Sequence, residues 1–345
     1  MTLTTRWYEA DNRFIPGHYQ PATLIDLALS RGIDSHRLLR GTGLFYDDIV
    51  AGHTRLSAQQ FFSLIGNAQR LLEADDSSFL LGQRLLPGHY GAASHALQHA
   101  HNLHQALETV IHHRALLSPL LTPRLLLDDK YAYVYWLDSC GAQEHLRFVL
   151  EASMTSLMAM TQWLSGERLP WECSFTYPEP RYVEQYWVHL GENSQFGCQL
   201  DMMRIPREYL TRAWPNASAI ARQVALQQAQ EQLHTLGFSA SLLDRVYVYL
   251  RDNAQHAPSL EQVAQYFSMS QATLKRKLNK HGTHFQAQQD LARKHVALYL
   301  YQIKGLSNDA VAEHLNFRDA ANFRRSLKRW TGCTPNLIRQ LFSLD

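Results

Sequence analysis

The same two-helix unit occurs twice near the C-terminal end of the chain, and this repeat constrains the fold more than any other feature. A Val-Ala pair at 263–264 recurs 48 residues later, and a basic pair at 275–276 recurs 49 residues later. Each copy has a short helix, a turn at Ser268 or Asn316, and a second, basic helix. Asn tolerates the left-handed backbone of such a turn, and the small Ala lets the second helix cross closely. The pattern predicts two helix-turn-helix units.

The segment between the copies, Phe285 to Gln302, has the pattern of one continuous helix. Such a helix is about 25 Å long, so two recognition helices held at its ends could enter successive major-groove turns, spaced roughly 34 Å. Its expected apolar face contains Leu291, His295 or Val296, Leu298, Tyr299 and Tyr301. No strand pattern occurs between Ser241 and Phe342, which is predicted to form seven short helices.

Charge is divided unevenly along the chain. Residues 239–345 contain 15 Lys and Arg against 8 Asp and Glu, whereas the rest contains 18 against 23. A basic C-terminal third beside a mildly acidic remainder indicates different partners for the two parts. The charges of the two basic helices could belong to an ordinary solvated face, but they recur at the same place in both copies.

The four cysteines lie far apart and form no CxxC pair, which favours a reducing compartment over a disulfide framework or zinc site. The N-terminal segment has no apolar stretch of a signal peptide, and no apolar run approaches the length that spans a membrane. We therefore expect a cytoplasmic protein without a membrane segment.

The first two thirds mix helix and strand patterns. Residues 58–72, with Ser57 as N-cap, and residues 102–117 each place apolar side chains on one helical stripe. A hairpin is predicted around Asp128–Lys130, followed by a long apolar helix at 146–164 and a strand beginning at Trp171. A Gln- and Ala-rich helix at 217–236 ends at Gly237. We predict an α+β domain over 1–236 and an all-α domain over 239–345.

Residues 241–342 resemble the DNA-binding domain of the AraC/XylS family, through "LNKHGTHFQ", "LARKHVALYL" and "NFRRSLKRWTGCTPNLIR" with Gly332, Pro335 and Arg339. The upstream region is similar to the arabinose-binding-type regulatory domain of one branch of that family. The segments "LLPGHYGAASHALQHAHNLHQALETVIHHRALLSP" and "MMRIPREYLTRAWPNAS" carry this similarity. Together the two resemblances cover nearly the whole chain.

The resemblance implies which side chains meet DNA. Base-reading positions would be Gln271, Ala272, Thr273, Lys275 and Arg276 in the first unit, and Ala320, Ala321, Asn322 and Arg325 in the second. Arg pairs bidentately with guanine, while Gln and Asn suit adenine. Phosphate contacts would come from Lys277, Lys280, Arg324, Lys328 and Arg329. Because Ala320 and Ala321 are short, the second unit is expected to read bases more weakly.

Other features of the first domain leave alternatives open. The histidines at 89, 95, 99, 101, 104, 112 and 113 could sense a metal, sense pH or contact a ligand, but ordinary surface or packed histidines account for them. A methionine cluster could line an effector pocket or simply belong to the core; it consists of Met154, Met158 and Met160 with Trp163. The same two alternatives apply to the aromatic run Tyr131, Tyr133, Tyr135 and Trp136. Motifs of hydrolases, metalloproteases and nucleotide-binding enzymes are absent from the sequence.

The sequence therefore predicts an α+β N-terminal regulatory domain followed by an all-α domain with two helix-turn-helix units joined by a linker helix. The expected protein is a sequence-specific transcriptional regulator that binds double-stranded DNA and associates with the nucleoid when bound. By resemblance, its N-terminal domain binds an unidentified small-molecule effector and forms a homodimer, and it activates transcription by recruiting RNA polymerase; repression is the alternative. We expect no catalytic residue, no metal site and no cofactor. An enzymatic N-terminal domain is the alternative from another class.

Overall fold

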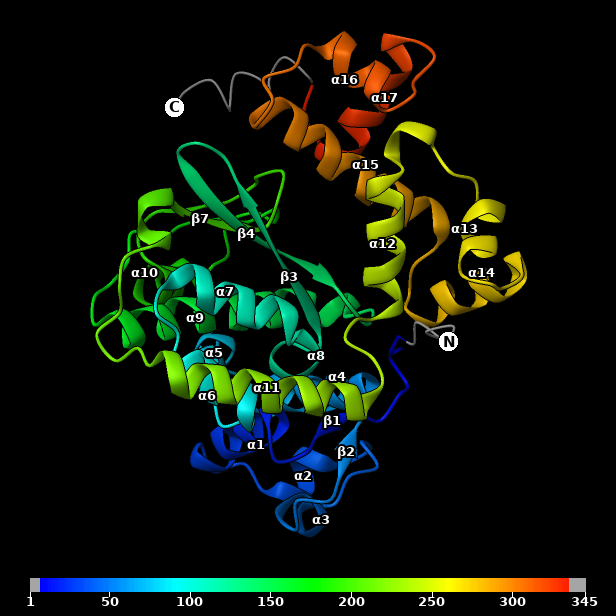
Figure 1. Cartoon of the computed structure of the whole chain (residues 1–345). Helices are drawn as coiled ribbons and strands as arrows, with labels where there is room; N and C mark the ends of the chain where they lie inside the picture. Colours follow the sequence, from blue (N-terminus) through cyan, green and yellow to red (C-terminus); the bar gives the residue numbers. More distant parts are fainter. Residues whose placement is uncertain (1–6, 335–345) are drawn as a thin grey trace. The chain divides into compact units, whose positions relative to one another are not determined.

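The computed structural model describes residues 7–334 and divides the chain into two compact units, Met1–Ser241 and Leu242–Asp345 (Figure 1). The first unit mixes helices and strands and the second is helical throughout its described residues. The predicted order, an α+β region followed by an all-α region, is confirmed. Pro335 and Arg339, which contributed to the resemblance, lie outside the described residues.

The first unit contains two sheets. The larger one has the strand order β3-β4-β7-β5-β6, antiparallel except for the β5–β6 pair. Its strands are β3 (Leu121–Leu127), β4 (Tyr131–Asp138), β5 (Glu172–Ser174), β6 (Ser194–Gln195) and β7 (Met202–Pro206). The small sheet pairs β1 (Ile15–Pro16) with β2 (Arg55–Leu56). The predicted hairpin is confirmed: the Asp128 carboxylate accepts hydrogen bonds from the backbone N–H groups of Lys130 and Tyr131, which closes the turn.

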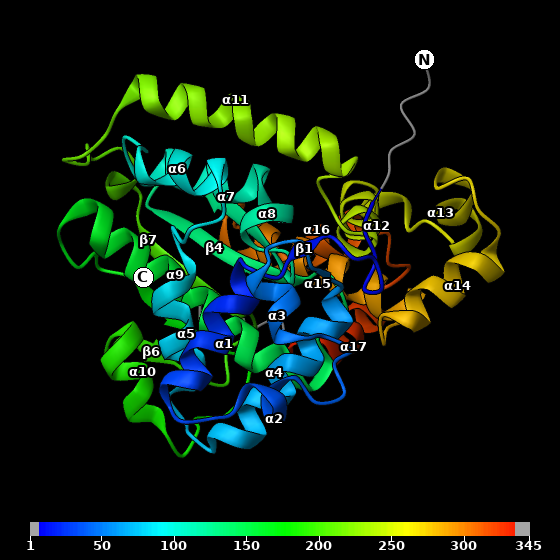
Figure 2. The ribbon, with the colours of Figure 1, turned by 90° about the horizontal axis from the view of Figure 1, so that it is seen from below.

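The helices of this part of the chain pack mainly against one another, and a few of them contact the larger sheet. The helices are α1 (Gln20–Ser30), α2 (Ser35–Leu39), α3 (Tyr46–Val50), α4 (Ala58–Leu72), α5 (Ser77–Leu85), α6 (Ala92–Gln98), α7 (Leu103–His112), α8 (Arg114–Leu117), α9 (Leu146–Ser165), α10 (Val183–Leu190) and α11 (Ala219–Leu236), with 3-10 turns η1 (Gln143–His145) and η2 (Arg207–Leu210). Helices α7 and α9 contact β3, α5 packs along α9, and α11 packs on α6 (Figure 2). The core lies between these layers, with Phe79, Met154 and Phe175 buried in it.

Local signals explain several helix ends. Helix α4 begins with a capping box, in which Ser57 and Gln60 exchange side-chain and backbone hydrogen bonds, and α11 ends at Gly237 with a left-handed backbone. The single helix predicted over 102–117 is wrong. The helix breaks at His113, which is 5% exposed and whose ring Nδ1 lies 3.1 Å from the Thr109 carbonyl oxygen, and α8 begins at the next residue.

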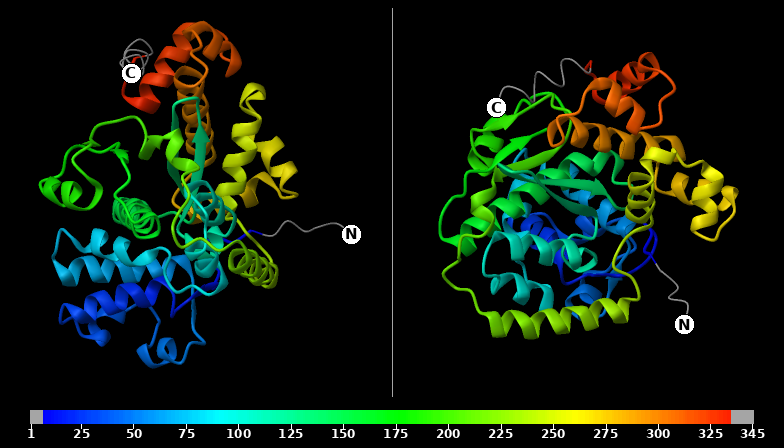
Figure 3. Two further views of the ribbon diagram at one scale, coloured as in Figure 1. Left: turned by 60° about the vertical axis from the view of Figure 1, so that its left-hand side comes forward. Right: turned by 45° about the horizontal axis from the view of Figure 1, so that its top comes forward.

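The second unit contains α12 (Leu242–Asp252), α13 (Leu260–Tyr266), α14 (Gln271–Lys280), α15 (Phe285–Gln302), α16 (Asn308–His314) and α17 (Ala320–Thr331), with a 3-10 turn η3 (Ala254–His256) (Figure 3). Seven short helices were predicted; up to Thr334 there are six α-helices, and α15 has 18 residues. The predicted apolar face of α15 is partly wrong. Leu298 and Tyr301 are buried, but Leu291 and Tyr299 are only half-buried, and Ala292, Ala297 and Leu300, which were not predicted, are buried as well.

Candidate DNA interface and ligand pockets

The two helix-turn-helix units share one backbone plan. Ser259 caps α13 and Ser307 caps α16, and the residue two positions after each of these helices has a left-handed backbone, with φ of 53° at Ser268 and 57° at Asn316. The next residue, Met269 or Phe317, donates its N–H to the carbonyl of Ala264 or Ala312 at 2.9 Å in both copies. The predicted turns are therefore confirmed in both units.

The second helix of each unit places two apolar side chains inside and its cations outside. Leu274 and Leu278 of α14, and Phe323 and Leu327 of α17, are buried at equivalent positions. Because residues three and four apart share a helix face, this burial leaves the opposite face of each helix to the polar side chains. Each unit therefore presents one basic stripe.

All predicted DNA-binding residues lie on α14 or α17. Exposed side chains are Gln271, Ala272, Lys275, Arg276 and Lys280 on α14, and Ala321, Asn322, Arg324, Arg325, Lys328 and Arg329 on α17; Thr273, Lys277 and Ala320 are half-buried. Thr273 is tied to the N-cap, since its backbone N–H and its hydroxyl lie 3.1 and 2.9 Å from the Ser270 hydroxyl. Its backbone N–H is therefore committed to the cap.

Side chains of the basic stripe of α17 are held by two acidic residues, Asp319 and Asp290. Asp319 caps α17 by accepting from the Asn322 backbone N–H at 2.6 Å, and Asn322 also accepts from the Arg325 guanidinium at 2.5 Å. Arg329 forms a 3.0 Å ion pair with Asp290 of α15. Sequence reasoning missed both acidic residues, although Asp319 stands where an N-cap is expected.

The N-terminal compact unit, Met1–Ser241, contains an apolar cavity of about 60 Å³, lined in part by α7, α9, β3 and β4. Trp136 belongs to its wall but the three methionines do not, so of the two alternatives left open for them the core is the one found. Met154, Met158 and Met160 are buried in the core on another side of α9, and Trp163 is 61% exposed. The helical stripe was recognised from the sequence, but which face of α9 meets the cavity depends on long-range packing.

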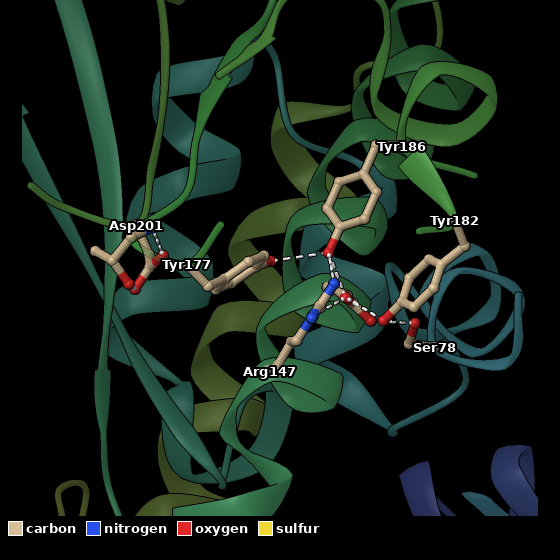
Figure 4. A network of polar contacts seen from close by, with 8 residues as sticks. Ser78, Arg147, Tyr177, Tyr182, Tyr186 and Asp201 are labelled. Atoms are coloured by element: carbon tan, nitrogen blue, oxygen red, sulfur yellow. Dashed lines mark hydrogen bonds and ion pairs between the residues drawn. The ribbon is translucent and has the colours of Figure 1, made fainter. Parts of the chain in front are cut away.

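A second, polar pocket of about 430 Å³ opens beside the N-terminal half of α9. On its inner wall the Glu151 carboxylate is 2% exposed and accepts from the hydroxyl groups of Ser78 (2.6 Å), Tyr182 (3.2 Å) and Tyr186 and from the Arg147 guanidinium (2.9 Å) (Figure 4). Burial, together with the nearby Glu151 carboxylate, raises the pKa of Tyr182 and Tyr186, so both remain neutral donors.

This pocket was not predicted from the sequence. One signal was available: Arg147 and Glu151 stand one helical turn apart in an otherwise apolar helix, and a charged pair at that spacing needs an explanation. The Tyr182 and Tyr186 donors come from α10 and its N-terminal boundary, which no local pattern connects with α9.

The histidines of the 89–113 run are dispersed. His113 is buried, His95 and His101 are exposed, and His89 lies 3.0 Å from the His18 carbonyl oxygen. Within residues 7–334 no group of three His, Cys, Asp or Glu side chains is arranged to hold a metal ion. In the same part of the chain, no helix has both the length and the apolar character needed to cross a membrane.

Comparison with known proteins gives a consistent result. Residues 32–214 match the family described as the arabinose-binding domain of AraC transcription regulator, and residues 263–340 match a helix-turn-helix domain family. The ornithine utilization regulator of Pseudomonas aeruginosa is 29% identical over 94% of this chain and 96% of its own. The regulator VqsM of the same organism is 29% identical over 40% of this chain and 43% of its own.

Among solved structures, the transcriptional regulator CdpR from Pseudomonas aeruginosa is similar at 20% identity and a TM-score of 0.39, covering 93% of this chain and 98% of its own. The family match extends over more than half of the chain, and its two parts correspond to the mixed and the helical regions described above. The chain belongs to the AraC family of helix-turn-helix transcription regulators and carries an arabinose-binding-type N-terminal domain.

Proposed function

We propose that α14 and α17 are the recognition helices of this regulator and bind one face of double-stranded DNA. The observation that carries the proposal is the recurrence of an exposed basic stripe after the same left-handed turn in both units. Helix α15 is about 27 Å long and joins the two units, which suits binding to successive major-groove turns about 34 Å apart. Residues 239–345 would form the DNA-binding domain.

Within each stripe the roles follow from chemistry. Gln271, Arg276, Asn322 and Arg325 can read base edges, and the exposed Lys275 can join them. Lys277, Lys280, Arg324 and Lys328 would contact phosphates, as would Arg329, whose guanidinium has further donors besides those facing Asp290. Thymine methyl groups could be contacted by Ala272, Ala320 and Ala321. Thr273 could contact a base edge or a phosphate.

Residues 1–236 would bind a small-molecule effector and mediate homodimerisation. The 430 Å³ pocket beside α9 is within the size range of small-molecule sites, roughly 300–1,000 Å³, and supports this assignment. Effector binding would then change which DNA half-sites are occupied and whether RNA polymerase is recruited. Activation is the proposed outcome, with repression as the alternative.

The test is selection of bound sequences from random duplex DNA by the full-length protein, followed by affinity measurements at several salt concentrations. We expect two short motifs about one helical turn apart and an affinity that falls steeply with salt. The matched variant is Arg276→Ala, with Lys304→Ala, an exposed cation outside both stripes, as control. A flat sequence profile, or an Arg276→Ala variant with unchanged affinity and preference, would refute the proposed recognition surface.

A further inference from the structure

The polar pocket beside α9 differs from the apolar cavity in size and in chemistry. It offers about 430 Å³ against about 60 Å³, and only its lining carries charged side chains. An ionised ligand would be costly in the apolar cavity, where nothing compensates its charge. The polar pocket is therefore the place for a charged metabolite.

The lining of the pocket has an excess of negative charge. Its acidic members are Glu73, Asp75, Glu144 and Glu151, and its basic members are Arg147 and Arg181. Arg147 pairs with Glu151 at 2.9 Å and Arg181 with Asp75 at 3.5 Å, which leaves the carboxylates of Glu73 and Glu144 in excess. The net charge of the lining at neutral pH is about −2, which favours a cation.

The imidazole of His145 does not neutralise this excess. Its Nε2 lies 3.7 Å from the Glu144 carboxylate, and its Nδ1 lies 3.1 Å from the side-chain oxygen of Gln69. Burial lowers the pKa of His145 below its ordinary value, although Glu144 acts in the opposite direction. The ring is therefore neutral at pH 7, and Glu144 remains available to a positively charged group.

The inner wall of the pocket holds one cation through several contacts. Four donors fix the Glu151 carboxylate, and the Arg147 guanidinium lies 4.5 Å and 5.0 Å from the ring centroids of Tyr177 and Tyr182 (Figure 4). Burial lowers the pKa of Arg147, but hydrogen bonds and charge interactions with Tyr186 and Glu151 raise it overall, so the group stays charged. A fixed guanidinium with free donors suits a carboxylate.

The backbone at the pocket is unusual at Glu73. This residue follows the last turn of α4 with φ of 46° and ψ of 36°, a left-handed conformation that is rare for a residue other than Gly, Asn or Asp. Left-handed backbone is common at the residue that ends a helix, so this conformation follows from the position of Glu73 as the C-cap of α4. Its side chain contributes one of the two carboxylates in excess.

From these observations we propose that the pocket binds a small basic amino acid, an aliphatic compound with a carboxylate at one end and an additional ammonium group. Glu73 and Glu144 would bind the additional ammonium group, while Arg147 and Arg181 would bind the carboxylate. The proposal rests on the proposed effector-binding role of residues 1–236 and specifies its ligand class. That the P. aeruginosa relative is an ornithine utilization regulator makes ornithine the natural first probe.

Three probes separate the parts of the proposal in calorimetric titrations of the full-length protein. Ornithine has all the required groups, norvaline lacks the side-chain amine, and 1,4-diaminobutane lacks the carboxylate. We expect saturable binding of ornithine and at least tenfold weaker binding of the other two. Norvaline binding as tightly as ornithine would overturn the role of the acidic residues. Diaminobutane binding as tightly would overturn the role of the arginines.

Variants then locate the site. Glu73→Gln and Glu144→Gln are each expected to weaken ornithine binding at least tenfold, whereas Glu192→Gln, an exposed carboxylate outside the pocket, should bind as the parent does. The folded state of each variant is checked by its thermal transition and its unchanged affinity for the selected DNA. If none of the three probes binds while the protein still binds that DNA and another metabolite alters the binding, this inference fails and the proposed function stands.

Discussion

The two helix-turn-helix units have the same backbone plan but different electrostatics at the start of the recognition helix. Helix α14 is capped by the neutral Ser270, whereas α17 is capped by the Asp319 carboxylate, which also binds the side chain of Asn322. A helix N-terminus attracts phosphate, and an anionic cap opposes that attraction. If both helices bind DNA as proposed, the cap of α14 does not oppose a phosphate, whereas α17 would first have to rearrange its polar side chains.

The turns differ by one residue as well. The cap Ser270 follows the left-handed Ser268 by two positions, whereas the cap Asp319 follows the left-handed Asn316 by three. The additional residue of the second turn is the exposed Arg318. This insertion explains why the sequence offset between the units changes from 48 to 49 within the turn. The second helix of each unit therefore begins at a slightly different distance from the turn, although the backbone plan of the two units is otherwise the same.

The largest expected effect is a loss of DNA affinity that differs between Arg276 and Arg325, two arginines at equivalent positions of the two units. Arg276→Ala should lower affinity for the selected DNA by about 1–3 kcal/mol and relax the preference at one base pair. Arg325→Ala should cost less, because in the free protein Arg325 already donates to Asn322 at 2.5 Å and gives up that bond on binding. Fluorescence anisotropy with both variants measures the difference. Equal or reversed losses would mean that the second unit reads bases as strongly as the first.

The next effect is a gain in affinity. Asp319→Ser gives α17 the cap of α14, keeps the capping oxygen, and removes a negative charge where phosphates would approach. We expect binding to tighten by about 0.5–1 kcal/mol at low salt. Asp309→Ser removes an exposed carboxylate from the first turn of α16 and serves as the control. If Asp319→Ser tightened binding no more than this control, the anionic cap would not explain the difference between the units.

A smaller effect concerns phosphate contacts. Lys280→Ala and Lys328→Ala should each weaken binding by a similar factor for all DNA sequences and reduce the slope of log affinity against log salt by about one. Both lysines are exposed on the basic stripes of their units. Affinity titrations at four salt concentrations give the slope. A variant that changed base preference instead would move that lysine to the base-reading group.

The smallest effect tests the two turns through stability. Left-handed backbone is costly for Ser and tolerated better by Asn, so Ser268→Asn should raise the free energy of unfolding by about 0.5 kcal/mol and Asn316→Ser should lower it by a similar amount. Chemical denaturation followed by circular dichroism measures both. Changes of the same sign would indicate that contacts of the side chains, rather than the backbone, dominate at these positions.

Local chemistry explains what could be predicted from the sequence. The capping box at Ser57, the hairpin at Asp128 and the doubled turns depend on neighbours within a few residues. The Glu151 pocket does not: its donors Ser78 and Tyr186 are 73 and 35 residues away along the chain. The same limit applies to α9, where periodicity identified the helix but could not indicate which face meets a cavity.

The length of α15 has a consequence for how such a gene can change. Eighteen residues make about five turns of helix, so the chain leaves α15 on nearly the same side on which it entered. Inserting a single codon within it would rotate the second helix-turn-helix unit by about 100° relative to the first, which would break the proposed simultaneous binding of both stripes to one DNA face. We therefore expect the length of α15 to be constrained more tightly than the identity of its side chains.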